Sequence, residues 1–84
     1  MRTLELFIDP ICFCKDKAEN FVKKILEDFP DILLKEINVF KNPERAQELG
    51  IKMFPTLALD GKVISVGLPE ENHLKNILKE NRND

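Results

Sequence analysis

The chain has 84 residues and a formal net charge of -2, with 43% hydrophobic and 33% charged residues. This composition is typical of a folded globular protein and excludes a disordered chain, and the length predicts a single domain over residues 1–84. A slightly acidic chain without a basic cluster is not expected to bind nucleic acid. Glu5 interrupts the N-terminal apolar run, so we expect no membrane span, no signal peptide and a cytoplasmic location.

Residues 3–8 (TLELFI) form the first predicted strand, which is apolar enough to be buried on both faces. It ends at Asp9-Pro10, and a helix is predicted over residues 15–29, ending before Pro30. The helix is predicted to be amphipathic because apolar residues recur every three or four positions. These residues are Ala18, Phe21, Val22, Ile25, Leu26 and Phe29.

Residues 31–40 (DILLKEINVF) form the second predicted strand. A strand, a helix and a strand with short connections predict a βαβ crossover, in which the two strands are parallel and the connection is right-handed. A short second helix is predicted over residues 43–49, with Asn42 as its N-cap, Pro43 at its first position and Gly50 at its C-terminal end.

Residues 56–59 and 62–66 are short β runs joined by Asp60-Gly61, which predicts a tight hairpin. A last helix is predicted to open at Pro69, with acidic residues in its first turn and an apolar stripe further on. The stripe contains Leu74, Ile77 and Leu78. The order βαβαββα predicts an α/β fold with a mixed four-stranded sheet and helices on both faces.

The two cysteines, Cys12 and Cys14, lie between the first strand and the first helix. Unpaired N–H groups and the dipole at a helix N-terminus stabilise a thiolate, which is the reactive form of cysteine. Two cysteines are too few for a disulfide scaffold, and a bridge closing so short a loop removes little entropy from the unfolded chain. A disulfide here is therefore expected to form and break. The alternative is that no bridge forms and the thiols bind metal or have no role.

This arrangement resembles the thioredoxin fold in its short, glutaredoxin-sized form, and the resemblance extends from about residue 3 to residue 78. Two motifs carry it: F-x-x-P-x-C at Phe7 to Cys12, and Phe54-Pro55-Thr56 leading into a strand, followed by Asp60-Gly61-Lys62 and Gly67. The chain is similar to the small thioredoxin-like proteins of archaea and anaerobic bacteria. The resemblance implies that Cys12 is the nucleophile, that Pro55 follows a cis peptide bond, and that Phe54 and Thr56 belong to the substrate-binding segment.

The chain departs from the family pattern at the second thiol. The family has C-x-x-C, whereas this sequence reads Cys12-Phe13-Cys14-Lys15, so Lys15 occupies the position of the second cysteine. Cys14 is a candidate resolving thiol or a spectator. The acid that thioredoxins bury late in the first strand is replaced by Leu6.

Several residues keep two interpretations. Lys15 is expected either to lower the pKa of Cys12 through its charge or to be an exposed first-turn lysine. Phe13 either contacts an apolar segment of a partner or packs into the core, and Phe54 has the same core alternative. Asp9 is interpreted as part of the Asp-Pro turn, and His73 as a surface residue.

The leading hypothesis is a small thiol–disulfide oxidoreductase without a cofactor or metal. Its catalytic residues are Cys12 and Cys14, its substrate-binding residues are Phe13, Phe54, Pro55 and Thr56, and Lys15 tunes the thiol. Its partners are expected to be a protein or small-molecule disulfide and an unidentified thiol reductant. One alternative is a metal-binding module, since two thiolates suit Cu(I) or Zn(II). Another is a redox-inert interaction domain with the same fold.

Overall fold

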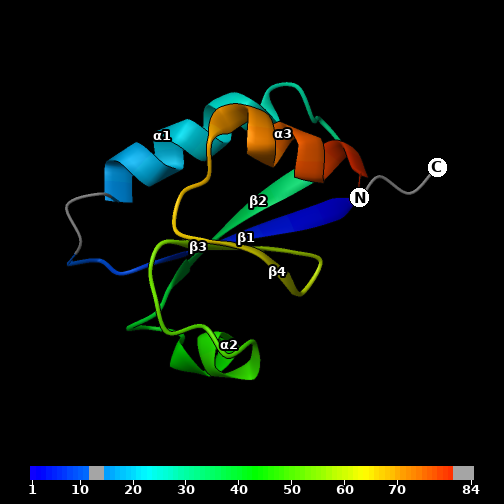
Figure 1. Cartoon of the computed structure of the whole chain (residues 1–84). Helices are drawn as coiled ribbons and strands as arrows, with labels where there is room; N and C mark the ends of the chain where they lie inside the picture. Colours follow the sequence, from blue (N-terminus) through cyan, green and yellow to red (C-terminus); the bar gives the residue numbers. More distant parts are fainter. Residues whose placement is uncertain (12–14, 81–84) are drawn as a thin grey trace.

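Strand β1, Arg2–Ile8, lies inside the sheet, and six of its seven residues are buried. The computed structural model describes residues 1–11 and 15–80. Strand β1 pairs in parallel with β2 and antiparallel with β3, so both of its edges are hydrogen-bonded. The sheet order is β2-β1-β3-β4 (Figure 1). The remaining strands are β2 (Ile32–Asn38), β3 (Thr56–Leu59) and β4 (Lys62–Val66).

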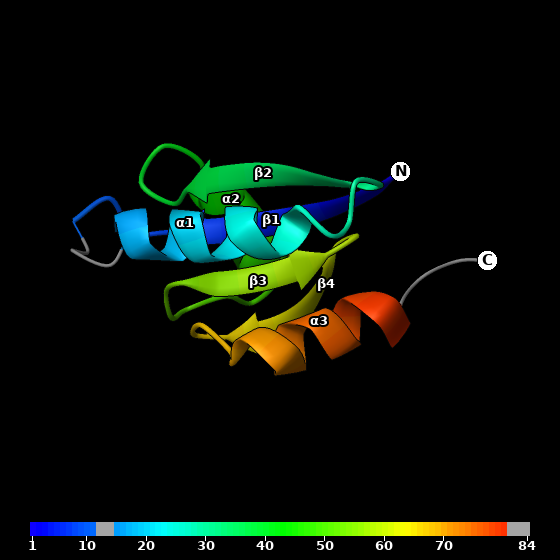
Figure 2. The same ribbon diagram turned by 90° about the horizontal axis from the view of Figure 1, so that it is seen from above.

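Helices cover both faces of this sheet. Helices α1 (Lys15–Leu26) and α3 (Glu71–Glu80) lie side by side on one face, and the short α2 (Pro43–Glu48) lies on the other (Figures 1 and 2). The predicted order βαβαββα, the mixed four-stranded sheet and the helices on both faces are confirmed.

The alternation of side chains along β1 divides the core into two clusters. Leu4, Leu6 and Ile8 point toward α1 and α3, where they join the predicted apolar faces of both helices. Phe7 belongs to the cluster on the opposite face, between the sheet and α2. The larger cluster contains Ala18, Val22, Ile25 and Phe29 from the first helical segment, Leu74 and Leu78 from α3, and Ile32, Leu57 and Leu59 from neighbouring strands.

The first helix ends three residues earlier than predicted, at Leu26 rather than Phe29. The chain tightens there: the N–H of Asp28 donates to the carbonyl of Ile25 at 3.1 Å, and that of Phe29 to Leu26 at 3.0 Å. Bonds that span three residues are typical of the last turn of a helix. Phe29 is nevertheless buried, because the tightened turn keeps its side chain over the core.

Other element ends and one predicted helix cap also differ from the predictions. Strand β2 ends at Asn38 because the Asn38 Oδ1 accepts hydrogen bonds from the N–H groups of Phe40, at 2.9 Å, and Lys41, at 3.3 Å, which turns the chain. Asn42 precedes α2 but its side chain makes no cap hydrogen bond. Helix α3 begins at Glu71, not at Pro69.

The predicted hairpin between β3 and β4 is confirmed. Asp60 and Gly61 both have positive φ, 49° and 84°, as the tight two-residue hairpin requires. The Asp60 carboxylate also accepts a hydrogen bond from the Thr3 N–H at 2.9 Å, which fixes the turn against the start of β1.

Candidate active site

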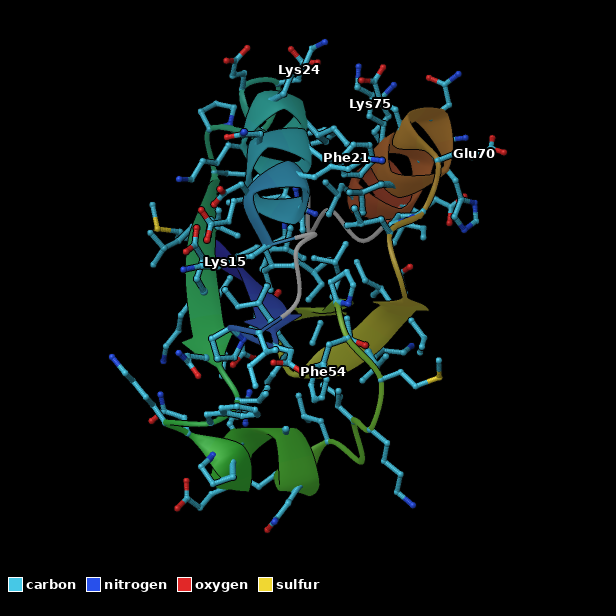
Figure 3. The ribbon with its side chains drawn as sticks, turned by 90° about the vertical axis from the view of Figure 1, so that its left-hand side faces the viewer. Lys15, Phe21, Lys24, Phe54, Glu70 and Lys75 are labelled. Carbon is cyan, nitrogen blue, oxygen red and sulfur yellow. The ribbon has the colours of Figure 1, made fainter. Side chains whose placement is uncertain are left out.

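Four segments meet at the end of the sheet where β1 finishes. Strand β1 ends at Ile8, α1 begins at Lys15, β3 begins just after Pro55, and β4 leads into Gly67. Figure 3 views this end of the molecule, with Lys15 at the start of α1 and Phe54 below it. The N–H of Gly67 donates to the carbonyl of Pro55 at 2.7 Å, so the segments before β3 and after β4 are fixed to each other.

The predicted thiols and Phe13 lie outside the described residues, which stop at Ile11 and resume at Lys15. The chain before them is a turn in which the Asp9 carboxylate accepts a hydrogen bond from the Ile11 N–H at 2.9 Å. This confirms the interpretation of Asp9 as a turn residue. The Ile11 side chain, next to Cys12 in sequence, is 70% exposed.

Lys15 is the first residue of α1 and its side chain is 45% exposed. Its Nζ lies 4.0 Å from the Glu19 carboxylate, one helical turn further on. Burial raises the pKa of Glu19 above its ordinary value of 4.5, and repulsion from the neighbouring Glu36 raises it further. A second lysine, Lys23, contacts Glu36 at 3.7 Å, so two lysines and two carboxylates form an electrostatic cluster between α1 and β2.

The peptide bond between Phe54 and Pro55 is cis, as the resemblance implied. The Phe54 side chain is half-buried and packs against the cluster between the sheet and α2. The Thr56 side chain is 1% exposed, and its hydroxyl donates to the Met53 carbonyl at 2.6 Å. The side chain of Thr56 therefore holds the segment before β3 in shape, and the surface beside it is formed by Met53 and Phe54.

Exposed apolar side chains surround this end of the sheet, and the sequence reasoning did not single them out. Ile11 follows β1, Phe40 follows β2, Met53 precedes β3 and Val66 ends β4. They are 60–70% exposed. Four of the six exposed large apolar side chains of the described residues thus lie at one end of the sheet, which is typical of a surface that contacts another molecule. Periodicity could not reveal them because each stands in a loop or at a strand end.

A buried acid was also missed. Leu6 occupies the position at which thioredoxins bury an acid, but Glu5, one residue earlier on the opposite face of β1, is 4% exposed. Arg45 of α2 donates two hydrogen bonds to its carboxylate, from Nε at 2.9 Å and from Nη2 at 2.7 Å. The signal was an acid inside an otherwise apolar strand, which predicts a buried partner.

No group of three or more histidine, cysteine or acidic side chains that could hold a metal ion occurs among residues 1–11 and 15–80. The predicted two-thiolate clamp falls outside those ranges. No helix in the part of the chain that the structure describes is both long and apolar enough to cross a membrane.

A four-stranded mixed sheet, a cysteine-containing segment between β1 and α1, and a cis-proline before β3 together define the thioredoxin-like class. A family model described as a thioredoxin domain matches residues 4–79. The chain is 35% identical over 77 residues to a thioredoxin of Methanocaldococcus jannaschii, with 90% of this chain and 91% of that protein covered. It is 26% identical over 80 residues to a probable thioredoxin of Archaeoglobus fulgidus, covering 94% of this chain and 88% of the other.

Solved structures agree with these sequence matches. A mutant thioredoxin from Halobacterium salinarum superposes with a TM-score of 0.78 at 29% identity, covering 94% of this chain and 73% of that one. A malarial protein at 18% identity, with a TM-score of 0.79 and 95% and 96% of the two chains covered, shares the fold. The chain belongs to the thioredoxin family, and it is a small thiol–disulfide oxidoreductase.

Proposed function

We propose that the chain catalyses thiol–disulfide exchange with protein substrates, with Cys12 as the nucleophile and Cys14 as the resolving thiol. One observation carries this proposal: the cis-proline segment, Phe54-Pro55, lies at the same end of the sheet as the two residues that flank the thiols, Ile11 and Lys15. The N-terminus of α1 supplies unpaired N–H groups and the positive end of a helix dipole, which stabilise a thiolate.

The exchange proceeds in two balanced steps. The Cys12 thiolate attacks one sulfur of a substrate disulfide, forms a mixed disulfide with it and expels the other substrate sulfur as a thiolate. The Cys14 thiolate then attacks the Cys12 sulfur, forming a bond between Cys12 and Cys14 and releasing the second substrate thiolate. The substrate gains two electrons and the protein loses two. An external thiol reductant returns these two electrons to the protein.

The substrate segment binds along the apolar end of the sheet. The substrate backbone pairs with the chain at Phe54, and Pro55 packs beside the nucleophile. The Thr56 hydroxyl keeps Met53 in position through its hydrogen bond to the Met53 carbonyl. Ile11 and Phe13 flank the nucleophile in sequence and contact apolar side chains of the substrate. Exposed apolar side chains at this end support that assignment, because burying them against a substrate is favourable.

Lys15 lowers the pKa of Cys12 in this proposal. Its ammonium stands at the first position of α1, and the Glu19 carboxylate 4.0 Å away offsets part of its charge. Lys15→Met is expected to slow alkylation of Cys12 at neutral pH and to shift the midpoint of the alkylation profile toward higher pH. An unchanged profile assigns Lys15 to the exposed surface alone.

The decisive experiment is insulin reduction combined with intact mass after thiol alkylation, in dithiothreitol redox buffers. The parent is expected to lose two hydrogen atoms, as two protons and two electrons, when a disulfide forms within the monomer at a defined potential. Cys12→Ser is expected to abolish the activity. Cys14→Ser is expected to accumulate a mixed disulfide, seen as an increase in the protein's mass by the mass of the attached substrate. His73→Gln, on the exposed side of α3, is the control and is expected to behave as the parent. Full activity in Cys12→Ser would show the proposal to be wrong.

A further inference from the structure

An apolar pocket of about 310 Å³ lies on the face of the sheet that α2 covers, beside the segment before β3. Its walls come from the segment that joins α2 to β3 and from the β3–β4 hairpin. Six side chains form most of them: Leu49, Ile51, Met53, Thr56, Val63 and Val66. Lys52 is the charged residue that borders it. The volume falls at the small end of the range for ligand pockets.

The pocket exists because α2 is too short to cover this face. Ala46 of α2 packs with Phe7, Ile37 and Ala58, which belong to β1, β2 and β3, and no described residue of β4 belongs to this cluster. Figure 1 shows the short helix under the sheet, with β4 at the edge. Strand β4 therefore keeps apolar side chains on this face without a helix over them: Val63 is half-buried and Val66 is 63% exposed.

The pocket adjoins the cis-proline segment. Met53 forms part of its rim and immediately precedes Phe54 and the cis-proline, and Thr56 of its wall donates the hydrogen bond that fixes Met53. A substrate segment that pairs with the chain at Phe54 lies beside this rim, because Met53 and Phe54 are adjacent in the chain. The rim has one positive charge, Lys52, and no carboxylate among its lining residues.

We propose that this pocket binds one large apolar side chain of a protein substrate, and that Lys52 favours an acidic residue beside it. The inference rests on the proposed function, because it needs a substrate that passes Phe54. The substrate class that follows is a protein disulfide whose cysteine is flanked by an apolar residue next to an acid. Small disulfides, which have no such side chain, gain nothing from the pocket.

The test separates binding from redox chemistry. The chain is isotopically labelled at its methyl groups and titrated with two peptides in which serine replaces the substrate cysteine. One peptide contains Leu-Glu and the other contains Ser-Lys at the same position. In further peptides this two-residue segment is moved one position at a time to either side of the serine. Saturable shifts are expected at the methyls of Ile51, Val63 and Val66 with the Leu-Glu peptide, while Ile25 on the opposite face stays unmoved. The affinity of the two peptides is expected to differ by about tenfold, as burial of one such side chain implies.

Two variants sharpen the result. Val66→Asp is expected to reduce the tenfold preference to near one, and Lys52→Glu is expected to shift the preference toward a Leu-Lys peptide. Leu33→Asp is the matched control, because Leu33 is also an exposed apolar residue on an edge strand, on the far side of the sheet. It is expected to keep the parent's preference.

The outcomes distinguish the two proposals. Equal affinity for the two peptides at every position, or shifts confined to residues outside the pocket, overturns the inference about the pocket. A loss of preference in Leu33→Asp as large as that in Val66→Asp also overturns it. Full insulin reduction by Cys12→Ser, with the parent's peptide preference retained, would instead contradict the proposed chemistry and leave the inference about the pocket in place.

Discussion

Arg45 of α2 grips the buried carboxylate of Glu5 in β1 with two hydrogen bonds, 2.9 Å from Nε and 2.7 Å from Nη2. Its Nη1 also donates to Glu48 at 3.0 Å. Hydrogen bonding to Glu5 raises the pKa of Arg45 above its already high ordinary value, and Glu48 adds to the effect. Because bidentate pairs are geometrically specific, this contact fixes the position of the six-residue α2 on the sheet, over Glu5 of β1.

Removing Arg45 alone is expected to cost more than removing both members of this pair. Arg45→Leu leaves the Glu5 carboxylate buried without its partner, whereas Glu5→Leu leaves a guanidinium that is 37% exposed and reaches water and Glu48. Urea unfolding of the two single variants and the double variant forms a double-mutant cycle. We expect Arg45→Leu to be the least stable of the three. Additive losses would show that the pair contributes nothing beyond its separate members.

The Glu19 carboxyl gives the stability a pH dependence. Its pKa in the folded state is raised, chiefly by burial and then by Glu36, so the proton stabilises the fold. That contribution is fully present below the ordinary pKa of 4.5 and is lost as the pH rises through the raised value. Lys15 and Lys23 face the same carboxyl and oppose the shift.

Glu19→Gln is therefore expected to be more stable than the parent at pH 7 and equal to it below about pH 4.5. The measurement is the free energy of unfolding from urea titrations at intervals between pH 4 and pH 8. Glu80→Gln, exposed at the last position of α3, serves as the control with an unchanged profile. Parallel curves for Glu19→Gln and the parent would contradict the assignment.

Leu74 carries much of the attachment of α3 to the core. It is fully buried in the cluster that also contains Leu78 and the apolar side of α1. Leu74→Ala removes three buried heavy atoms and leaves a cavity, so we expect a loss of about 3 kcal/mol in the free energy of unfolding. Leu33→Ala, at a side chain that is 53% exposed, is the control and is expected to stay within about 0.5 kcal/mol of the parent. Similar losses in both would contradict this.

Gly67 is required for its backbone conformation. Its φ is +83°, and an added Cβ would meet nothing within 4 Å, so sterics with neighbours do not enter. Gly67→Ala is expected to cost about 1 kcal/mol through the left-handed conformation alone. Gly67→Asn should recover part of that loss, because asparagine tolerates this region. Thermal unfolding of the three proteins measures the order, and an alanine variant as stable as the parent would refute the explanation.

The architecture could be predicted from sequence because strong local signals agree with one another. The apolar period of residues 18–29 and the Asp60-Gly61 turn both appear in the structure where they were expected. The ends of elements were less accurate, because tertiary contacts decide them: the last turn before Phe29 tightens over the core, and Asn38 ends β2 by bonding to its own following backbone.

The site was only partly predictable. The cis bond at Pro55 was implied by the family resemblance that the motif around it carries. The partnership of Glu5 with Arg45 could not be predicted, because it joins a strand to a helix forty residues away and neither residue belongs to a motif. The pocket under β4 depends on how little of the sheet α2 covers, a property of packing and not of any short stretch of sequence.

The order β2-β1-β3-β4 has a consequence for synthesis on the ribosome. Strand β1 leaves the exit tunnel first, yet Leu4 pairs with Leu59, so one edge of the innermost apolar strand has no native neighbour until the second half of the chain emerges. During that interval only β2 can pair with it. The nascent chain therefore presents an open, apolar strand edge, the feature that chaperones recognise and that aggregation exploits.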